Sequence, residues 1–187
     1  SVLDRTPGHL LFHRAGFLGG APMYTLGPLG EAHRHEVVDI FNIHVARGCG
    51  TFFAEQVSAA FFDLLLRAVG DHPAQAATAN GRLAGFSLLR PYHALPVFRR
   101  TAEISTFLAP EHMGKGLGAM LLMEMENLAK ARQIDNLLAA IAADNAVSLR
   151  FHGKRGFQPC GRFARIGVKQ GYDLDVIWMQ KTLESGK

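Results

Sequence analysis

The sequence predicts an α/β domain of the α+β kind, in which helices pack on a sheet that is not doubly wound. Asn80-Gly81 lies between two strand-compatible runs, which is a strong signal for a tight hairpin and hence for antiparallel neighbours. A glycine-rich turn at 114–118 follows a strand and opens the longest helical stripe in the chain. The run Asn136–Ala143 behind that helix is almost wholly apolar, as expected of a strand covered on both faces.

The chain is predicted to divide into an irregular N-terminal extension over residues 1–35 and a single domain over residues 36–187. The extension has little periodicity and carries turn residues such as Gly19-Gly20 and Gly27-Pro28. The remaining length suits one domain with one core, because domains typically run to about 100–150 residues. No internal repeat suggests a further division.

The elements follow in order along the domain. Helical spacing of apolar residues begins at Glu36 and predicts a first helix that stops at Gly48. Ser58 suits the N-cap of a second helix over Ala59–Val69. The remaining elements are predicted as strands at 74–79, 82–89, 101–108, 136–143, 157–168 and 174–183, a long helix after Gly116, and a short helix from Asp144 or Asn145 to Lys154.

Composition argues against several classes of function. No apolar run approaches the roughly 18 residues that span a bilayer, so we expect no membrane partner. The 20 lysines and arginines are scattered rather than clustered with aromatic residues, which argues against nucleic acid and favours a basic cleft for an anionic small molecule. Cys49 and Cys160 fit neither a disulfide framework nor a zinc site, so no metal is expected.

The glycine turn Gly114-Lys115-Gly116-Leu117-Gly118-Ala119 carries the main chemical signal. Glycines there let backbone N–H groups and the start of a helix converge on an anion such as a pyrophosphate. A P-loop would need Ser or Thr after the lysine that follows the last glycine, and Ala119-Met120 supplies neither. A Rossmann site would need an acidic residue at the end of the next strand, whereas Asp135 begins it. A merely structural turn remains the other interpretation.

The segment Phe107–Gly118 resembles the strand and pyrophosphate loop of GNAT N-acetyltransferases. Asp144-Asn145, Ser148, Phe151-His152 and Arg155-Gly156-Phe157 resemble the phosphinothricin and methionine-sulfoximine acetyltransferase branch of that superfamily. The resemblance implies a GNAT fold, with a mixed and strongly twisted central sheet that splays between two strands and is flanked by helices. It also implies acetyl-CoA as cosubstrate and no metal.

The resemblance assigns cofactor contacts to three groups of residues. Backbone groups of Phe107 and Leu108 would pair with the pantetheine arm, amides from Met113 to Ala119 would cradle the pyrophosphate, and Asn145 and Ser148 would line the pantetheine side. As alternatives, Phe107 and Leu108 are core residues and Lys115 is solvated. The cofactor-binding residues expected are Phe107, Leu108, Met113, Gly114, Lys115, Gly116, Leu117, Gly118, Ala119, Asn145 and Ser148.

Glu103 and His152 stand at the branch's characteristic catalytic positions. The resemblance makes Glu103 the general base, and the alternative is a structural carboxylate that pairs with Arg99 or Arg100. It makes His152 the proton donor or relay for the departing thiolate, and the alternative is a packed helical histidine.

Tyr92, His93 and Arg99 are expected near the acceptor amine. Arg90, Arg99 and Arg100 are also candidates for recognising a carboxylate. His93 and Leu95 stand where the branch commonly has arginines that hold the substrate carboxylate, which argues against phosphinothricin itself as the substrate.

These residues together predict an enzyme that moves an acetyl group from acetyl-CoA to a primary amine of a small amino-acid-like molecule or xenobiotic by direct attack. The alternatives are acetylation of a peptide or protein amine, and a non-catalytic acyl-CoA-binding module. A cytoplasmic location is expected because acetyl-CoA is made and used there. The resemblance also allows a homodimer, because many enzymes of this type dimerise.

Overall fold

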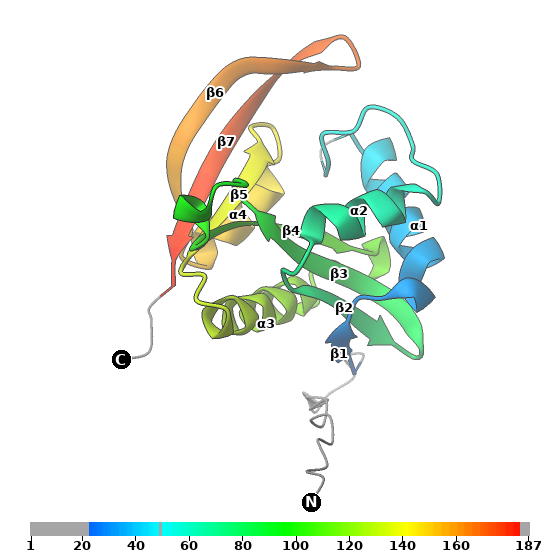
Figure 1. Cartoon of the computed structure of the whole chain (residues 1–187). Helices are drawn as coiled ribbons and strands as arrows, with labels where there is room; N and C mark the ends of the chain where they lie inside the picture. Colours follow the sequence, from blue (N-terminus) through cyan, green and yellow to red (C-terminus); the bar gives the residue numbers. More distant parts are fainter. Residues whose placement is uncertain (1–22, 49, 184–187) are drawn as a thin grey trace, which may run out of the picture.

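The computed structural model describes residues 23–48 and 50–183 and shows an open seven-stranded sheet with helices on both faces (Figure 1). The strands lie in the order β1-β2-β3-β4-β5-β7-β6. Their bounds are Thr25–Pro28 (β1), Ala74–Ala79 (β2), Arg82–Pro91 (β3), Thr101–Leu108 (β4), Asn136–Ala142 (β5), Gln158–Lys169 (β6) and Tyr172–Thr182 (β7). The helices are α1 (Arg34–Ala46), α2 (Phe61–Val69), α3 (Leu117–Ala131) and α4 (Ala146–Lys154).

The sheet is mixed, as the resemblance implies. Neighbouring strands pair antiparallel except β4 and β5, which pair parallel. The predicted hairpin joins β2 and β3, and its two turn residues Asn80 and Gly81 have φ of +51° and +76°. Positive φ at both positions suits a tight two-residue turn, because its twist matches that of the flanking strands. The predicted α/β (α+β) class is therefore confirmed.

The parallel pairing of β4 and β5 is short. It joins Thr101 to Asn136, Ala102 to Leu137 and Glu103 to Leu138, and then stops. β4 continues to Leu108 and β5 continues to Ala142 without pairing with each other. The sheet is therefore split between its fourth and fifth strands (Figure 1).

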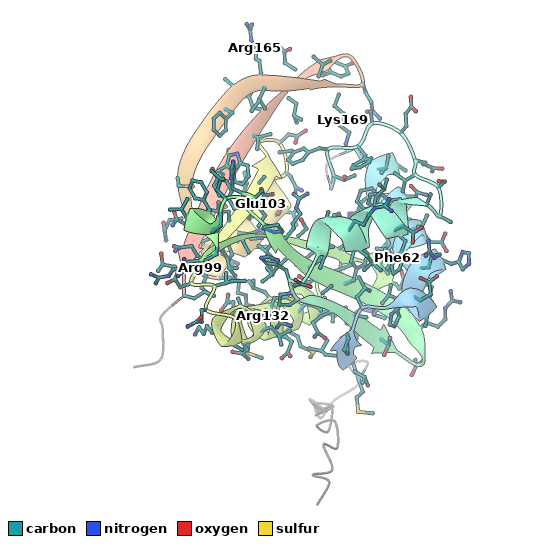
Figure 2. All side chains as sticks on the ribbon, viewed as in Figure 1. Phe62, Arg99, Glu103, Arg132, Arg165 and Lys169 are labelled. Carbon is teal, nitrogen blue, oxygen red and sulfur yellow. The ribbon has the colours of Figure 1, made fainter. Side chains whose placement is uncertain are left out.

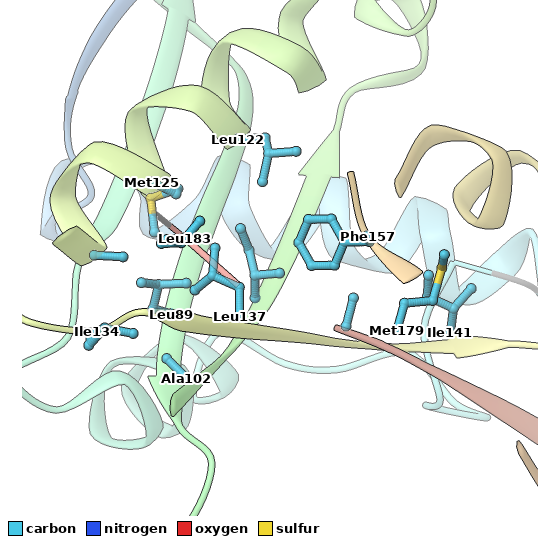
Figure 3. Close-up of a cluster of buried hydrophobic side chains, with 13 residues drawn as sticks. Leu89, Ala102, Leu122, Met125, Ile134, Leu137, Ile141, Phe157, Met179 and Leu183 are labelled. Atoms are coloured by element: carbon cyan, nitrogen blue, oxygen red, sulfur yellow. The ribbon is translucent and has the colours of Figure 1, made fainter. Parts of the chain in front are cut away.

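Each face of the sheet has its own core. Helices α1 and α2 cover one face, where Phe62 packs with Leu88 of β3. Helix α3 covers the opposite face, where Met125 packs with the cluster around Leu89 (Figure 3). Leu88 and Leu89 point to opposite faces of the sheet because successive side chains of a strand alternate between its two faces. Helix α4 lies on the α3 side, since its Phe151 packs against the same cluster as Met125.

The N-terminal prediction is corrected for the part of it that the structure describes. The irregular extension was expected over residues 1–35, but β1 pairs with β2 and Tyr24 is buried beside α3. Short length and the Gly27-Pro28 pair hide this strand in the sequence, and its position at the sheet edge tolerates proline. Residues 1–22 lie outside the described residues.

One helix start also differs from the prediction. Ser58 was expected to cap a helix from Ala59, but α2 begins at Phe61 and has no side-chain cap. Instead, the Phe61 amide donates to the carbonyl oxygen of Ser58 at 2.9 Å. At α4 the choice between two caps is decided, because Asn145 Oδ1 accepts from the Ser148 amide at 3.0 Å. Within the described residues, no helix has both the length and the apolar character that crossing a bilayer requires.

The burial of Leu137 in the core beside the split leads to a prediction about the stability of the protein. Leu137 of β5 is fully buried, so Leu137→Ala should lower the free energy of unfolding by about 2–5 kcal/mol through lost burial and a residual cavity. Leu95→Ala is the matched control, because Leu95 is 56% exposed and its loss should change stability by less than about 0.5 kcal/mol. Urea unfolding of both variants measures the difference, and equal effects would contradict this account of the core.

Candidate active site

A cavity of about 330 Å³ lies where β4 and β5 part. Its lining includes Phe61 from α2, Glu103 and Phe107 from β4, and Ser148 and His152 from α4. Helices α2 and α4 cover opposite faces of the sheet (Figure 1). Because residues of both helices line the cavity, it reaches both faces. Figure 2 shows Glu103 at this place, near the middle of the molecule.

Glu103 is paired with an arginine that differs from the expected partners. It lies opposite Arg90 of β3, and Arg90 Nη2 donates to Glu103 Oε2 at 2.7 Å. The Glu103 side chain is 17% exposed and that of Arg90 is 43% exposed. The sequence analysis considered Arg99 or Arg100, but Arg100 pairs with Asp135. Arg90 Nε is buried without a hydrogen-bond partner in the described part of the chain.

His152 is held in one tautomer by its own helix. Its Nδ1 lies 2.9 Å from the carbonyl oxygen of Ser148, which only accepts, so Nδ1 carries the proton and Nε2 is the basic nitrogen. The ring also packs edge-on against Phe151 and Phe157, with centroids 5.1 and 5.0 Å away. Burial lowers the pKa of His152 below its usual value, although the hydrogen bond to Ser148 partly opposes this. The neutral imidazole therefore predominates at neutral pH.

Glu103 and His152 approach the cavity from opposite faces. Ala102 and Ile104 point into the core beneath α3, so Glu103 between them points to the α1–α2 face. His152 belongs to α4, which lies on the α3 face. A negatively charged side chain and a neutral imidazole thus face the same cavity across the split sheet.

The glycine loop is exposed and carries free amides. Residues 113–116 are exposed, and Gly114 and Gly116 have φ of +72° and +85°. The amides of Ala119 and Met120 bond to Gly116 O, whereas those of 114–118 donate no backbone hydrogen bond within the described residues. The amides of residues 114–116, just before α3, are therefore open to solvent, as an anion site requires.

The other predicted residues of the glycine loop differ in their burial. Leu117 is fully buried, and a Cβ on Gly118 would lie 3.4 Å from the Phe151 ring, so the start of α3 is packed tightly against α4. Met113 and Lys115 are exposed, while Ala119 is half-buried. Lys115 makes no ion pair in the described structure, which leaves its interpretation as a solvated residue open.

Phe107 and Leu108 lie at the end of β4 as expected, but a histidine that the sequence analysis did not single out contacts both. His44 of α1 is buried, and its Nε2–H donates to Leu108 O at 2.9 Å. Its ring lies edge-on to Phe107 at 5.5 Å. Burial lowers the pKa of His44. The carbonyl of Leu108 is thus engaged within the protein, and the sequence shows His44 only as one position of a helical stripe.

Tyr92, His93 and Arg99 lie in the connection between β3 and β4, outside the cavity lining. Tyr92 and His93 pack around Phe98, with ring centroids 5.7 and 5.0 Å from it. Arg99 is exposed, and Figure 2 shows it at the left side of the molecule. The structure does not bring these residues into the cavity with Glu103, and their role at the substrate stays a prediction.

The connection between α1 and α2 forms a wall of the cavity that the sequence did not reveal. Gly50, Thr51, Phe52 and Phe53 line it. Lys169, near the tip of the β6–β7 hairpin, donates to Gly48 O at 2.7 Å and to Thr51 O at 2.6 Å (Figure 2). More than a hundred residues separate the partners, so no local pattern signals the contact. Within the described residues, no group of three or more His, Cys, Asp and Glu is placed to hold a metal.

Comparison with known proteins places these features in a family. The L-methionine sulfoximine/L-methionine sulfone acetyltransferase of Salmonella typhimurium is 33% identical over 113 residues, or 60% of this chain and 66% of the relative. The L-amino acid N-acyltransferase MnaT of Escherichia coli is 30% identical over 63% of this chain and 69% of the relative. The chain thus spans slightly less than two thirds of the first relative.

A solved structure is also similar. The GNAT superfamily phosphinothricin acetyltransferase (Pat) from Sinorhizobium meliloti in complex with AcCoA has a TM-score of 0.80 and 27% identity, over 87% of this chain and 90% of that one. Residues 37–157 match the model of the acetyltransferase (GNAT) family, and this range contains the split strands, the glycine loop, Glu103 and His152. The chain therefore belongs to the acetyltransferase (GNAT) family.

Proposed function

We propose that the protein transfers an acetyl group from acetyl-CoA to the primary amine of a small amino-acid-like molecule or xenobiotic. The observation that carries this proposal is the cavity through the split sheet, with Glu103 and His152 on opposite faces. The names of the similar proteins support it, since they are acetyltransferases or acyltransferases of methionine sulfoximine, L-amino acids and phosphinothricin.

The residues present fit acetyl-CoA. The exposed residues 114–116, whose amides donate no backbone hydrogen bond within the described residues, and the start of α3 suit its pyrophosphate. The edge of β4 beyond Glu103 does not pair with β5 and suits the amides of the pantetheine arm. Asn145 and Ser148 line the cavity beside this edge. We therefore propose that these groups hold the cosubstrate.

The positions of the two side chains support the following proton path. Acetyl-CoA supplies a thioester whose carbonyl carbon is open to attack and whose sulfur departs as a thiolate. The acceptor nitrogen, which enters as an ammonium, loses two protons in all, of which one ends on the thiol and one in solvent. Glu103 accepts the proton that frees the nitrogen lone pair, directly or through water. His152 is neutral at rest, so its Nε2 accepts the second proton that the nitrogen loses and passes it to the departing sulfur.

Lys169 of the β6–β7 hairpin holds the α1–α2 connection, which lines the cavity. Because this contact bounds the cavity, it favours a small acceptor over a protein chain. Loss of the arginines usual at His93 and Leu95 is the feature that would favour a protein amine or a non-catalytic module instead. Tyr92, His93 and Arg99 are proposed to lie at the entrance for the acceptor. A cytoplasmic location, a homodimer, and the lack of nucleic-acid and membrane partners stay predictions.

Acetyl-CoA binding tests the glycine loop. A Cβ at Gly116 would meet no atom within 4 Å, so the side chain of Gly116→Glu would enter the space before the free amides with a charge that repels phosphate. We expect acetyl-CoA to bind at least about tenfold more weakly in calorimetry, equivalent to ~1.4 kcal/mol. Gly81→Glu in the β2–β3 turn is the control, because Gly81 is exposed, has a similar positive φ of +76° and therefore a similar backbone strain, and a Cβ there also meets nothing. Equal affinities in the two variants would remove the loop from the cosubstrate site.

Replacement of Glu103 tests its part in the chemistry. Glu103→Gln keeps the shape and a hydrogen-bond acceptor but removes the base, so kcat should fall roughly 100-fold or more while the Kd for acetyl-CoA changes by less than about threefold. Thiol release with a broad panel of amines measures the rate. Glu36→Gln on α1, which lies outside the cavity, should leave the rate unchanged. An unaltered rate in the Glu103 variant would assign that carboxylate a structural role.

The pH dependence tests His152. Because burial lowers its pKa, the basic imidazole is present at pH 7 and disappears only as the pH falls through a value below about 6.5. Because the acceptor enters as an ammonium, we expect log kcat/KM to stay level as the pH is lowered from neutrality and to fall once the pH drops below the pKa of His152. His152→Gln should be slower and should lose this fall. A wild-type profile that rises with acid in this range would instead indicate a resting imidazolium donor.

A further inference from the structure

We infer that Arg90 binds a carboxylate of the acceptor and that a cluster of phenylalanines contacts the acceptor's side chain. The preferred acceptors are therefore α-amino acids with a large apolar side chain. This inference rests on the proposed function and narrows its substrate. It assigns Arg90 a recognition role, where the sequence only suggested it as one of several candidate arginines.

The phenylalanine cluster consists of three rings that contact one another. The ring centroids of Phe41 and Phe61 are 4.3 Å apart, and Phe53 lies 5.2 and 5.4 Å from them. Phe41 and Phe61 are nearly buried, whereas Phe53 is 46% exposed although it also lines the cavity. The buried rings hold the third in place, and its open face offers apolar surface to a ligand. A large apolar group placed there would leave water.

The charged end of the cavity contains one cation and one anion. Among the described lining residues, Arg90 is the only lysine or arginine and Glu103 the only carboxylate. They are already paired, so this end carries no net charge. An α-amino acid is a zwitterion whose ammonium meets Glu103 and whose carboxylate meets Arg90. A polyamine would bring further positive charges for which the described lining has no second carboxylate.

Arg90 has the donors that this role needs. Only Nη2 bonds to Glu103, and Nε is buried with no partner among the described residues. A guanidinium carries five N–H donors in a planar fork, and a carboxylate accepts two of them at once. The Arg90 side chain is 43% exposed and uses one donor on Glu103, so donors at the outer end of the guanidinium remain for a carboxylate.

The test compares L-phenylalanine, 2-phenylethylamine, which lacks the carboxylate, and L-alanine, which lacks the ring. Each is assayed for thiol release with acetyl-CoA, and each is titrated calorimetrically into the protein saturated with CoA. For the wild type, we expect kcat/KM for phenylalanine to exceed that of either analogue by roughly 10- to 100-fold, as expected for one charged hydrogen-bonding group or one buried ring.

The variants separate the two contacts. Arg90→Gln should reduce the preference for phenylalanine over phenylethylamine to within about threefold, mainly through KM, and Arg90→Lys should restore it in part because the charge remains without the fork. Phe53→Ala should reduce the preference for phenylalanine over alanine. The controls are Arg67→Gln, on the exposed side of α2, and Phe163→Ala, on β6, which lie outside the cavity and should keep both preferences.

The outcomes distinguish this inference from the proposed function. If the wild type shows no preference for phenylalanine, or if Arg90→Gln and Arg90→Lys keep the wild-type ratio, Arg90 does not recognise a carboxylate. If no amine is acetylated but phenylalanine binds the wild type and not Arg90→Gln, the recognition site stands and the proposed catalysis fails. If phenylalanine neither binds nor reacts while other amines are acetylated, the proposed function stands and this inference is wrong.

Discussion

The short pairing of β4 with β5 is the constraint on which the site depends. Three residue pairs hold the strands together, and beyond Glu103 and Leu138 each backbone edge loses its partner. Unpaired edges inside a protein need other hydrogen-bond partners, so a split sheet is suited to a ligand that carries amides of its own. The same split lets residues from α2 and α4, which lie on opposite faces, line one cavity.

The glycine loop is placed by packing on its far side. Leu117 and Leu121 of α3 are fully buried, and Gly118 lies close against Phe151, so the first turn of the helix has little freedom to move. The residues just before it, 113–116, are exposed. A rigid helix start behind an open loop keeps free amides oriented without cost at the time of binding. This arrangement is the structural reason for interpreting the turn as an anion site rather than a simple connection.

The two ionisable groups at the cavity differ because their surroundings differ. Glu103 is paired with the guanidinium of Arg90. His152 is packed between aromatic rings, with one nitrogen bonded to a carbonyl, which disfavours the imidazolium. An ion pair thus lies on one face of the split, and a neutral imidazole lies on the other. The two faces of the cavity accordingly differ in their electrostatic character.

Local patterns in the sequence determined the strands from β2 to β5, the long helix and the glycine turn, because alternation, helical spacing and positive-φ residues act over a few neighbours. Glu103, His152 and the loop residues were predicted as site residues from ordered motifs. Only the tertiary structure decided four other features. These are strand β1, the Arg90–Glu103 pair, the buried His44 and the hydrogen bonds from Lys169 to the α1–α2 connection. Each of these joins segments far apart in the chain, so their contacts depend on how the sheet twists and splits, which no short stretch of residues specifies.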